Sequence, residues 1–180
     1  MYKIYILLFS ILFFMKDSNL ILFDFNTKSN ISNWRVVDDV VMGGRSNGNF
    51  RLNKNGHAEF YGDVSLENSG GFSSVRYRFE SIQILNSKEI VIRLKGDGKK
   101  YQFRVKDKSN NNYSYISTFT TSGNWENITI QLSEMYPAFR GRKLNMDNFS
   151  AESIEQIAFL IGNKKQQRFK LEIDKIFFSK

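Results

Sequence analysis

Apolar and polar residues alternate with a period of two along most of the chain. In the segment 101–106, Tyr101, Phe103 and Val105 occupy one face and polar residues occupy the other. The segment 169–174 repeats the pattern, with phenylalanine, leucine and isoleucine at alternate positions. This period is typical of a β-strand that buries one of its faces.

Other segments are enriched in β-branched and aromatic residues and are also predicted to be strands. They are 20–25, 34–41, 57–64, 72–79, 89–95, 113–119, 125–132 and 157–161. Turns rich in Gly, Asn and Ser separate them, at 47–49, 53–56, 68–71, 96–98, 109–112 and 122–124. Single helical turns are expected at 133–136 and 151–156. The pattern predicts an all-β chain, a jelly-roll β-sandwich of two antiparallel sheets in one domain.

The N-terminal segment has a different pattern. Lys3 precedes an apolar run over residues 4–15, and Lys16 follows it. This order is typical of a signal peptide, and the run is too short to span a bilayer comfortably. We expect residues 1–19 to be a signal peptide or an N-terminal anchor and residues 20–180 to form the domain. The protein is then exported to the periplasm, cell envelope or medium, with membrane anchoring as the alternative; a buried first strand is the competing interpretation.

Composition removes several classes of site. The chain has no cysteine and a single histidine, His57, which excludes disulfides, thiolate metal sites, cysteine nucleophiles and multi-histidine metal sites. Lysine and arginine outnumber acidic residues by 26 to 18, a formal net charge of +8. Because the positive residues are scattered, the sequence predicts a solvated sheet face and no nucleic-acid partner. Weak peripheral contact with anionic membrane surfaces is expected.

Three glycine-containing turns stand out. The segment 34–48 predicts a strand that runs into Met42-Gly43-Gly44-Arg45-Ser46, the segment 66–76 contains Gly70-Gly71-Phe72, and a third turn covers 96–98. Paired glycines permit positive φ angles and close backbone approach. No predicted helix follows these turns, so they do not fit phosphate-binding loops.

In this order, these blocks resemble the complex I intermediate-associated protein 30 family. The resemblance is carried by Leu22–Phe25, Trp34, Asp39, Val41–Ser46, Phe60–Gly62, Glu67, Asn68, Gly70–Arg76, Gly96–Gly98, Tyr101, Trp125, Phe139–Arg142 and Phe169–Ile176. It implies a galactose-binding-like β-sandwich and a non-enzymatic interaction module, an assembly factor or chaperone for a protein partner. The chain has Val40 where the family pattern has glycine, and its N-terminus is not Arg-rich, which indicates a bacterial-type member.

The three turns also define a candidate binding site, because loops gather at the ends of a sandwich. Polar groups would come from Arg45, Asn68, Arg76 and Asp97, and apolar anchors from Met42 and Phe72. The complete candidate set is Asp39, Met42, Gly43, Gly44, Arg45, Ser46, Asn68, Gly70, Gly71, Phe72, Arg76 and Asp97.

The charged residues of this set also have structural interpretations. Asp38 and Asp39 are adjacent, so on a strand they point to opposite faces and cannot act as an acid/base pair. Asp39 is predicted to hold the turn together, with a structural Ca²⁺ as the alternative and no other cofactor expected. Arg45 and Arg76 are predicted to pair with Asp39, Asp97 or Glu67, with recognition of a sugar or carboxylate as the alternative.

Function is therefore expected to be binding rather than catalysis, because the sequence contains no nucleophile–base pair and no cofactor loop. A protein partner is the first hypothesis and a glycan the second. A glycan site would need exposed aromatic rings. Candidates are Tyr113, Tyr115, Phe119, Tyr136 and Phe139, whereas Trp34 and Trp125 are predicted to be core anchors.

Overall fold

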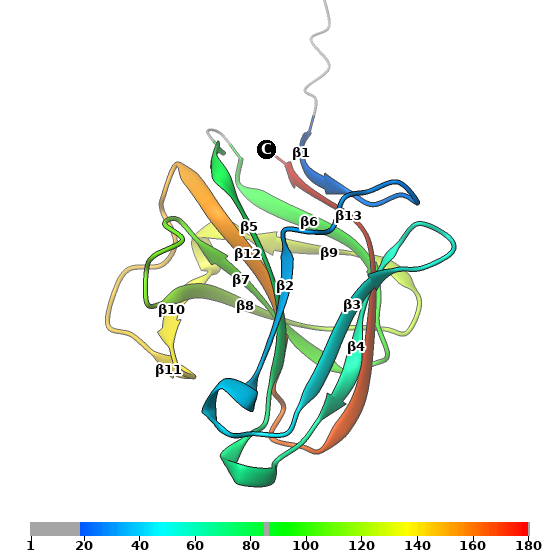
Figure 1. Cartoon of the computed structure of the whole chain (residues 1–180). Coiled ribbons are helices and arrows are strands. Elements are labelled where there is room, and N and C mark those ends of the chain that lie inside the picture. The colour runs from blue at the N-terminus through cyan, green and yellow to red at the C-terminus, as the bar shows by residue number, and fades with distance from the viewer. Residues whose placement is uncertain (1–18, 85–86, 180) are drawn as a thin grey trace, which may run out of the picture.

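The computed structural model describes residues 19–84 and 87–179 (Figure 1). The predicted signal peptide or anchor therefore lies outside the described residues, apart from Asn19. The strands of the described part are β1 (Leu20–Asp24), β2 (Trp34–Asp38), β3 (Asn47–Leu52), β4 (Ala58–Val64), β5 (Ser73–Gln83), β6 (Glu89–Lys95), β7 (Lys100–Lys106), β8 (Ser114–Thr120), β9 (Trp125–Gln131), β10 (Tyr136–Phe139), β11 (Arg142–Lys143), β12 (Ser153–Ile161) and β13 (Gln167–Ser179). Short 3-10 turns form η1 (Asp39–Met42), η2 (Glu67–Ser69) and η3 (Leu132–Glu134).

The strands form two antiparallel sheets. One sheet has the order β3-β4-β13-β6-β9, and β1 also pairs with β13. The other has the order β11-β10-β8-β7-β12-β5-β2. Some neighbours are consecutive in the sequence, such as β3 and β4, and others come from distant parts of it, as β13 beside β4 and β6 shows. The predicted all-β sandwich of two antiparallel sheets is confirmed.

The core lies between the sheets and is built from the alternate residues that the period of two identified. Tyr101, Phe103 and Val105 of β7 are fully buried, and so are Leu171 and Ile173 of β13. Because the side chains of a strand alternate, the residues between them point out of the sandwich. Each sheet therefore has an outer face whose chemistry the strand register determines.

Several element predictions need correction. The predicted turn 47–49 is the start of β3, and the predicted helical turn 151–156 contains the first half of β12. The predicted strand 34–41 ends at Asp38, where the chain enters η1.

The two ends of the described chain lie together. Leu20 of β1 pairs with Phe178 of β13, and the 13 residues of β13 lead from there to Gln167, which pairs with Val64. In Figure 1, β1 and the C-terminus lie at the upper end, and the turns η1 and η2 lie at the lower end. The loops around η1 and η2 are therefore far from the ends of the described chain.

Candidate functional site

The end of the domain that carries the loops around η1 and η2 is called the loop end, and Asp39 lies at its centre. Its side chain is completely buried and accepts hydrogen bonds from the Ser46 backbone N–H (2.9 Å) and hydroxyl (2.5 Å). It also accepts bonds from the backbone N–H groups of Gly71 (2.6 Å) and Phe72 (3.1 Å). Burial alone would raise the pKa of Asp39, but these hydrogen bonds outweigh it and hold the pKa below its ordinary value. One carboxylate thus fastens both glycine-rich loops together.

The paired glycines are required by this arrangement. A Cβ on Gly44 would lie 2.3 Å from Asp39 Oδ1, and a Cβ on Gly70 would lie 2.7 Å from Oδ2. Gly43 and Gly71 have φ angles of +89° and +138°, which residues other than glycine rarely adopt. The sequence prediction of close approach and positive φ in these pairs is confirmed.

The fastened loops expose apolar side chains. Val40, Val41 and Met42 of η1 are 59%, 75% and 60% exposed, and Leu66, next to η2, is 43% exposed. We call these four residues the apolar tip. Sequence reasoning proposed Met42 but missed Val40 and Leu66, although apolar residues flanking glycine-rich turns were a usable signal.

The remaining polar residues of the two loops bind each other. Arg45 Nη1 lies 2.9 Å from Glu67 Oε2, and the Asn68 side chain donates to the Gly43 carbonyl (3.1 Å). The Arg45–Glu67 pair predicted by the sequence is therefore present, but both side chains are exposed, so it is not part of a buried network. Phe72 is half-buried beside the Asp39 carboxylate that its N–H contacts.

Two predicted site residues lie elsewhere. Arg76 is in the middle of β5, opposite Ala158 of β12, and forms no ion pair within the described chain, which corrects its predicted pairing. Asp97 accepts hydrogen bonds from the Lys99 ammonium, the Tyr101 hydroxyl and the Lys170 N–H. These bonds tie the turn 96–98 to β7 and β13, while Asp39 organises the other two loops.

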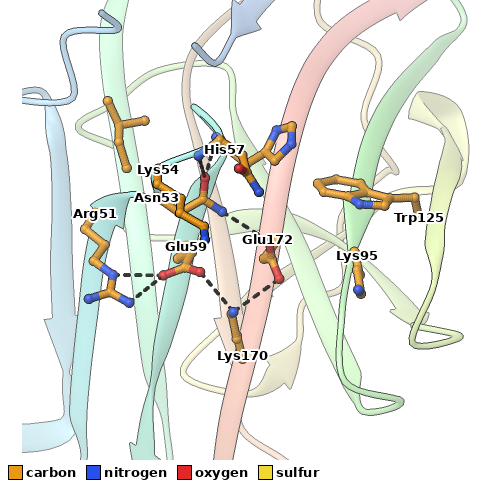
Figure 2. A pocket seen from close by; sticks show the side chains of 11 residues that line it. Arg51, Asn53, Lys54, His57, Glu59, Lys95, Trp125, Lys170 and Glu172 are labelled. Atoms are coloured by element: carbon orange, nitrogen blue, oxygen red, sulfur yellow. Dashed lines mark hydrogen bonds and ion pairs between the residues drawn. The ribbon is translucent and has the colours of Figure 1, made fainter. Parts of the chain in front are cut away.

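A second concave region lies on the outer face of the sheet that contains β13. Figure 2 shows this groove of about 600 Å³, with Arg51 of β3 on one side and Trp125 of β9 on the other. Strand register explains the arrangement, because Arg51, Glu59, Glu172, Lys95 and Trp125 are consecutive partners across five strands. This cross-strand row forms the floor of the groove, and Asn53, His57 and Lys170 also line it.

Charges in this groove compensate one another. Glu59 is buried and contacts Arg51 through Nε and Nη2 (both 2.8 Å) and Lys170 through Nζ (2.9 Å), as the dashed lines of Figure 2 show. Burial would raise the pKa of Glu59, but Lys170 and Arg51 lower it below its ordinary value. Lys170 also lies 3.2 Å from Glu172. Each of the two carboxylates is thus compensated by at least one cation.

The aromatic residues are distributed differently from the prediction. Trp34 is buried as predicted, but Trp125 is half-exposed, with its ring centroid 4.6 Å from that of His57. Tyr115 and Phe119, proposed as exposed glycan platforms, are buried in the core. Tyr113 and Tyr136 are half-buried, and Phe139 is 40% exposed.

Within residues 19–84 and 87–179, no three His, Asp or Glu residues gather into a group suited to a metal ion. The Asp39 carboxylate is surrounded by N–H and O–H donors rather than by the oxygen ligands that Ca²⁺ requires. Among the described helices, none has the length and hydropathy needed to cross a bilayer.

Comparison with known sequences identifies relatives. The model of the family "Complex I intermediate-associated protein 30" matches residues 23–173. The mitochondrial protein of that name from Mus musculus is 26% identical over 178 residues, a match that covers 86% of this chain and 54% of the mouse protein. The chain thus spans about half the length of that curated relative.

Comparison with solved structures identifies the fold. A family 11 carbohydrate-binding module from Clostridium thermocellum, in complex with a β-1,3-1,4-mixed-linked tetrasaccharide, has a TM-score of 0.67 and 18% identity, covering 89% of this chain and 94% of that one. The family 11 module of the cellulase Lic26A-Cel5E from the same organism has a TM-score of 0.68 and 16% identity, covering 91% and 95%. At this identity the likeness establishes the sandwich fold.

Proposed function

Because this chain belongs to the complex I intermediate-associated protein 30 family, we propose that it is a non-enzymatic binding module that docks onto a protein partner through its loop end. The mouse relative is named for its association with intermediates of complex I. Incompletely assembled proteins expose apolar surfaces that are later buried. For this chain we propose a partner of that kind, a protein with an unburied apolar groove.

The apolar tip is the observation that carries this proposal. Val40, Val41 and Met42 are consecutive and largely exposed, and Leu66 lies on the neighbouring loop. Contiguous exposed apolar residues on a folded domain mark interaction sites, whereas isolated ones do not. On a partner, these side chains would act as the buried anchors of an interface rimmed by Arg45 and Glu67.

The loops are preorganised for binding. Asp39 fixes Ser46 of one loop and Gly71 of the other, and the Asn68 side chain adds a bond to the Gly43 carbonyl. A loop that is already ordered loses little conformational entropy when it binds. The buried carboxylate therefore supports affinity without touching the partner.

The arrangement of acidic groups supports a binding role without catalysis. The Asp39 carboxylate accepts hydrogen bonds from Ser46, Gly71 and Phe72. The Glu59 carboxylate forms ion pairs with Arg51 and Lys170. Neither carboxylate is positioned as a general base with a lone pair directed toward an open site.

Site-specific photo-crosslinking in the native host tests the proposal. A photoreactive phenylalanine analogue replaces Val41 in one variant and Met146, an exposed apolar residue outside the apolar tip, in the control. We expect a discrete protein adduct from position 41, absent from position 146, that disappears when Met42→Asp is added. Unfolding curves check that Met42→Asp leaves the domain folded.

Other crosslinking results would contradict the proposal. A lipid adduct, or equal adducts from both positions, would overturn the proposal. A discrete adduct that survives Met42→Asp in a folded protein would place the contact outside the apolar tip.

We also propose that the protein is exported, on the basis of the charged and apolar pattern of residues 1–19. Fractionation of the native host, followed by mass spectrometry of the N-terminal peptide, tests this. An intact N-terminus in the cytosolic fraction contradicts export.

A further inference from the structure

The outer face of the seven-stranded sheet gathers cationic residues that are dispersed in the sequence. Arg76 of β5 pairs in register with Arg35 of β2 on one side and with Ala158 of β12 on the other, and Ala158 pairs with Arg104 of β7. In the adjacent row, Gln156 of β12 lies between two further cationic residues, Arg78 and Lys106. We call Arg35, Arg76, Arg78, Arg104 and Lys106 the cationic face. Positive residues that are scattered in the sequence are thus neighbours on this sheet face.

These residues point out of the sandwich. Their strand neighbours Trp34, Val75, Phe103, Val105, Ile157 and Phe159 are buried core residues, so alternation directs the cationic residues to the opposite side. The first row continues from Arg104 to Ile116 of β8 and Tyr136 of β10. It crosses six strands, a width of about 24 Å at the usual strand spacing.

Within the described chain, none of these five cations forms an ion pair. Arg78 donates to the Gln156 side-chain oxygen (2.9 Å), and Arg104 donates through Nε (3.0 Å) and Nη2 (2.6 Å) to that of Gln102. Lys106 donates to the Asn111 carbonyl. These neutral acceptors orient Arg78, Arg104 and Lys106 without an ion pair, and Asp107 is an acidic residue near enough to act on Lys106.

Burial makes this grouping costly. Burial, followed by the nearby charge of Arg76, lowers the pKa of Arg104 to about 10. Burial and Arg78 also lower the pKa of Arg76. The pKa of Lys106 is lowered by burial and by the charges of Arg76 and Arg78. Half-buried like charges side by side destabilise a fold unless something neutralises them.

The other sheet provides an internal comparison. Its outer row places the two acids Glu59 and Glu172 side by side between Arg51 and Lys95, in the groove of Figure 2. On that face Arg51 and Lys170 form ion pairs with these carboxylates, whereas the cations of the cationic face form no such pairs within the described chain. The missing negative charge indicates an external anion.

We propose that the cationic face binds an acidic polysaccharide, a chain whose sugar rings carry carboxylate or sulfate groups. Guanidinium groups recognise such oxyanions in a bidentate manner. Arg76 and Arg104 are two strands apart and share Ala158 as their partner; Ala158 is buried, so an oxyanion would bind the two guanidinium groups from the solvent side. Cations that recur across the strands match an extended ligand with repeated charges.

Uncharged groups on the same face favour a sugar chain over other polyanions. Gln102 provides a half-buried amide group that can hydrogen-bond with hydroxyls, and Tyr136 provides an aromatic surface at the end of the row, with Lys143 Nζ 5.5 Å from its ring centroid. A single aromatic ring is a poor platform for successive nucleobases, which need stacking partners. This site is separate from the apolar tip, so either proposal can fail alone.

Titration calorimetry with polygalacturonate at physiological ionic strength tests the proposal. The matched ligand is the same polymer with its carboxylates methyl-esterified. We expect binding of the acidic polymer only, and a loss of about tenfold or more in affinity for Arg76→Gln and for Arg104→Gln. Arg168→Gln, an exposed cation on the other sheet, is the control and should change affinity less than about twofold.

Stability measurements separate a binding role from a structural one. Removing one of several repelling charges should leave the unfolding midpoint of Arg76→Gln and Arg104→Gln unchanged or raise it. If either variant fails to fold, the exposed residue Arg78 provides a replacement test through Arg78→Gln. Equal binding to the esterified polymer, to polyglutamate or to an oligonucleotide would overturn the proposal, and so would full affinity in the folded double variant.

Discussion

Removing the Asp39 carboxylate should destabilise the domain more than removal of any exposed acid. Asp39→Ala leaves the Ser46, Gly71 and Phe72 backbone N–H groups and the Ser46 hydroxyl without their acceptor. An unsatisfied buried donor costs about 1–3 kcal/mol, and local opening lets water reach some of them. We therefore expect a loss of about 4 kcal/mol in the free energy of unfolding.

Asp39→Asn should be less damaging, because the amide keeps one acceptor oxygen. With that oxygen in the position of Oδ2, which accepts three of the four bonds, the NH₂ group would still face the Ser46 backbone N–H, which Oδ1 now accepts at 2.9 Å. The expected loss is about 2–3 kcal/mol, which places this variant between the wild type and Asp39→Ala.

The difference between wild type and Asp39→Ala should depend on pH in a defined direction. Hydrogen bonds hold the folded pKa of Asp39 below the ordinary value of 3.8 despite its burial. A carboxyl group with a lowered folded pKa contributes its full stability above its unfolded pKa and loses it as the pH falls through the folded value. The two unfolding curves should therefore converge only in strong acid.

Denaturant unfolding followed by tryptophan fluorescence measures these effects, because Trp34 is buried and reports loss of the core. Asp63→Ala is the control, since Asp63 forms only an exposed pair with Arg168 and should leave the midpoint near that of wild type. An Asp39→Ala midpoint matching this control would refute the conclusion that Asp39 fastens the loops.

Two further predictions follow from contacts around buried carboxylates. Gly44→Ala should lower the free energy of unfolding by about 2 kcal/mol or more, because its Cβ would lie 2.3 Å from Asp39 Oδ1. The control Gly98→Ala meets no atom within 4 Å and should cost about 1 kcal/mol, from its φ of +78° alone. Thermal unfolding compares the two variants, and equal losses of stability would contradict the steric argument. Glu59→Gln should lower the free energy of unfolding by about 1–2 kcal/mol at neutral pH and by less in acid. The lowered pKa of Glu59 reflects stabilisation by Lys170, which is lost as the pH falls through the pKa of Glu59 in the folded protein. A difference in denaturant midpoints that does not change with pH would contradict this prediction.

Most of the fold could be predicted because alternation records which residues are buried. The predictions for β6 and β7 differ from the structure by at most one residue. β3 was missed because its first residues, Asn47 to Asn49, have turn composition, although Phe50 and Leu52 pack against the core. β2 was extended too far because Val40 and Val41 favour strands, while the contacts of Asp39 with distant loops turn the chain into η1.

The candidate site was predicted only where its determinants are local. The glycine pairs and the role of Asp39 in the turn could be read from neighbouring residues. Register is a property of the folded sheet, so the sequence did not indicate that Arg76 lies two strands from Arg104, nor that Trp125 ends a charged row. The charges on a sheet face depend on which strands become neighbours.

The pairing of β1 with the end of β13 determines where the domain can be attached to a support. The 13 residues of β13 extend about 40 Å, from the chain ends beside Leu20 to the loop end beside Val64. A tether, reporter or solid support joined beside Leu20 or beside Phe178 would therefore lie at one pole of the described domain. The apolar tip lies near the opposite pole, so a partner would approach it from the side away from the attachment.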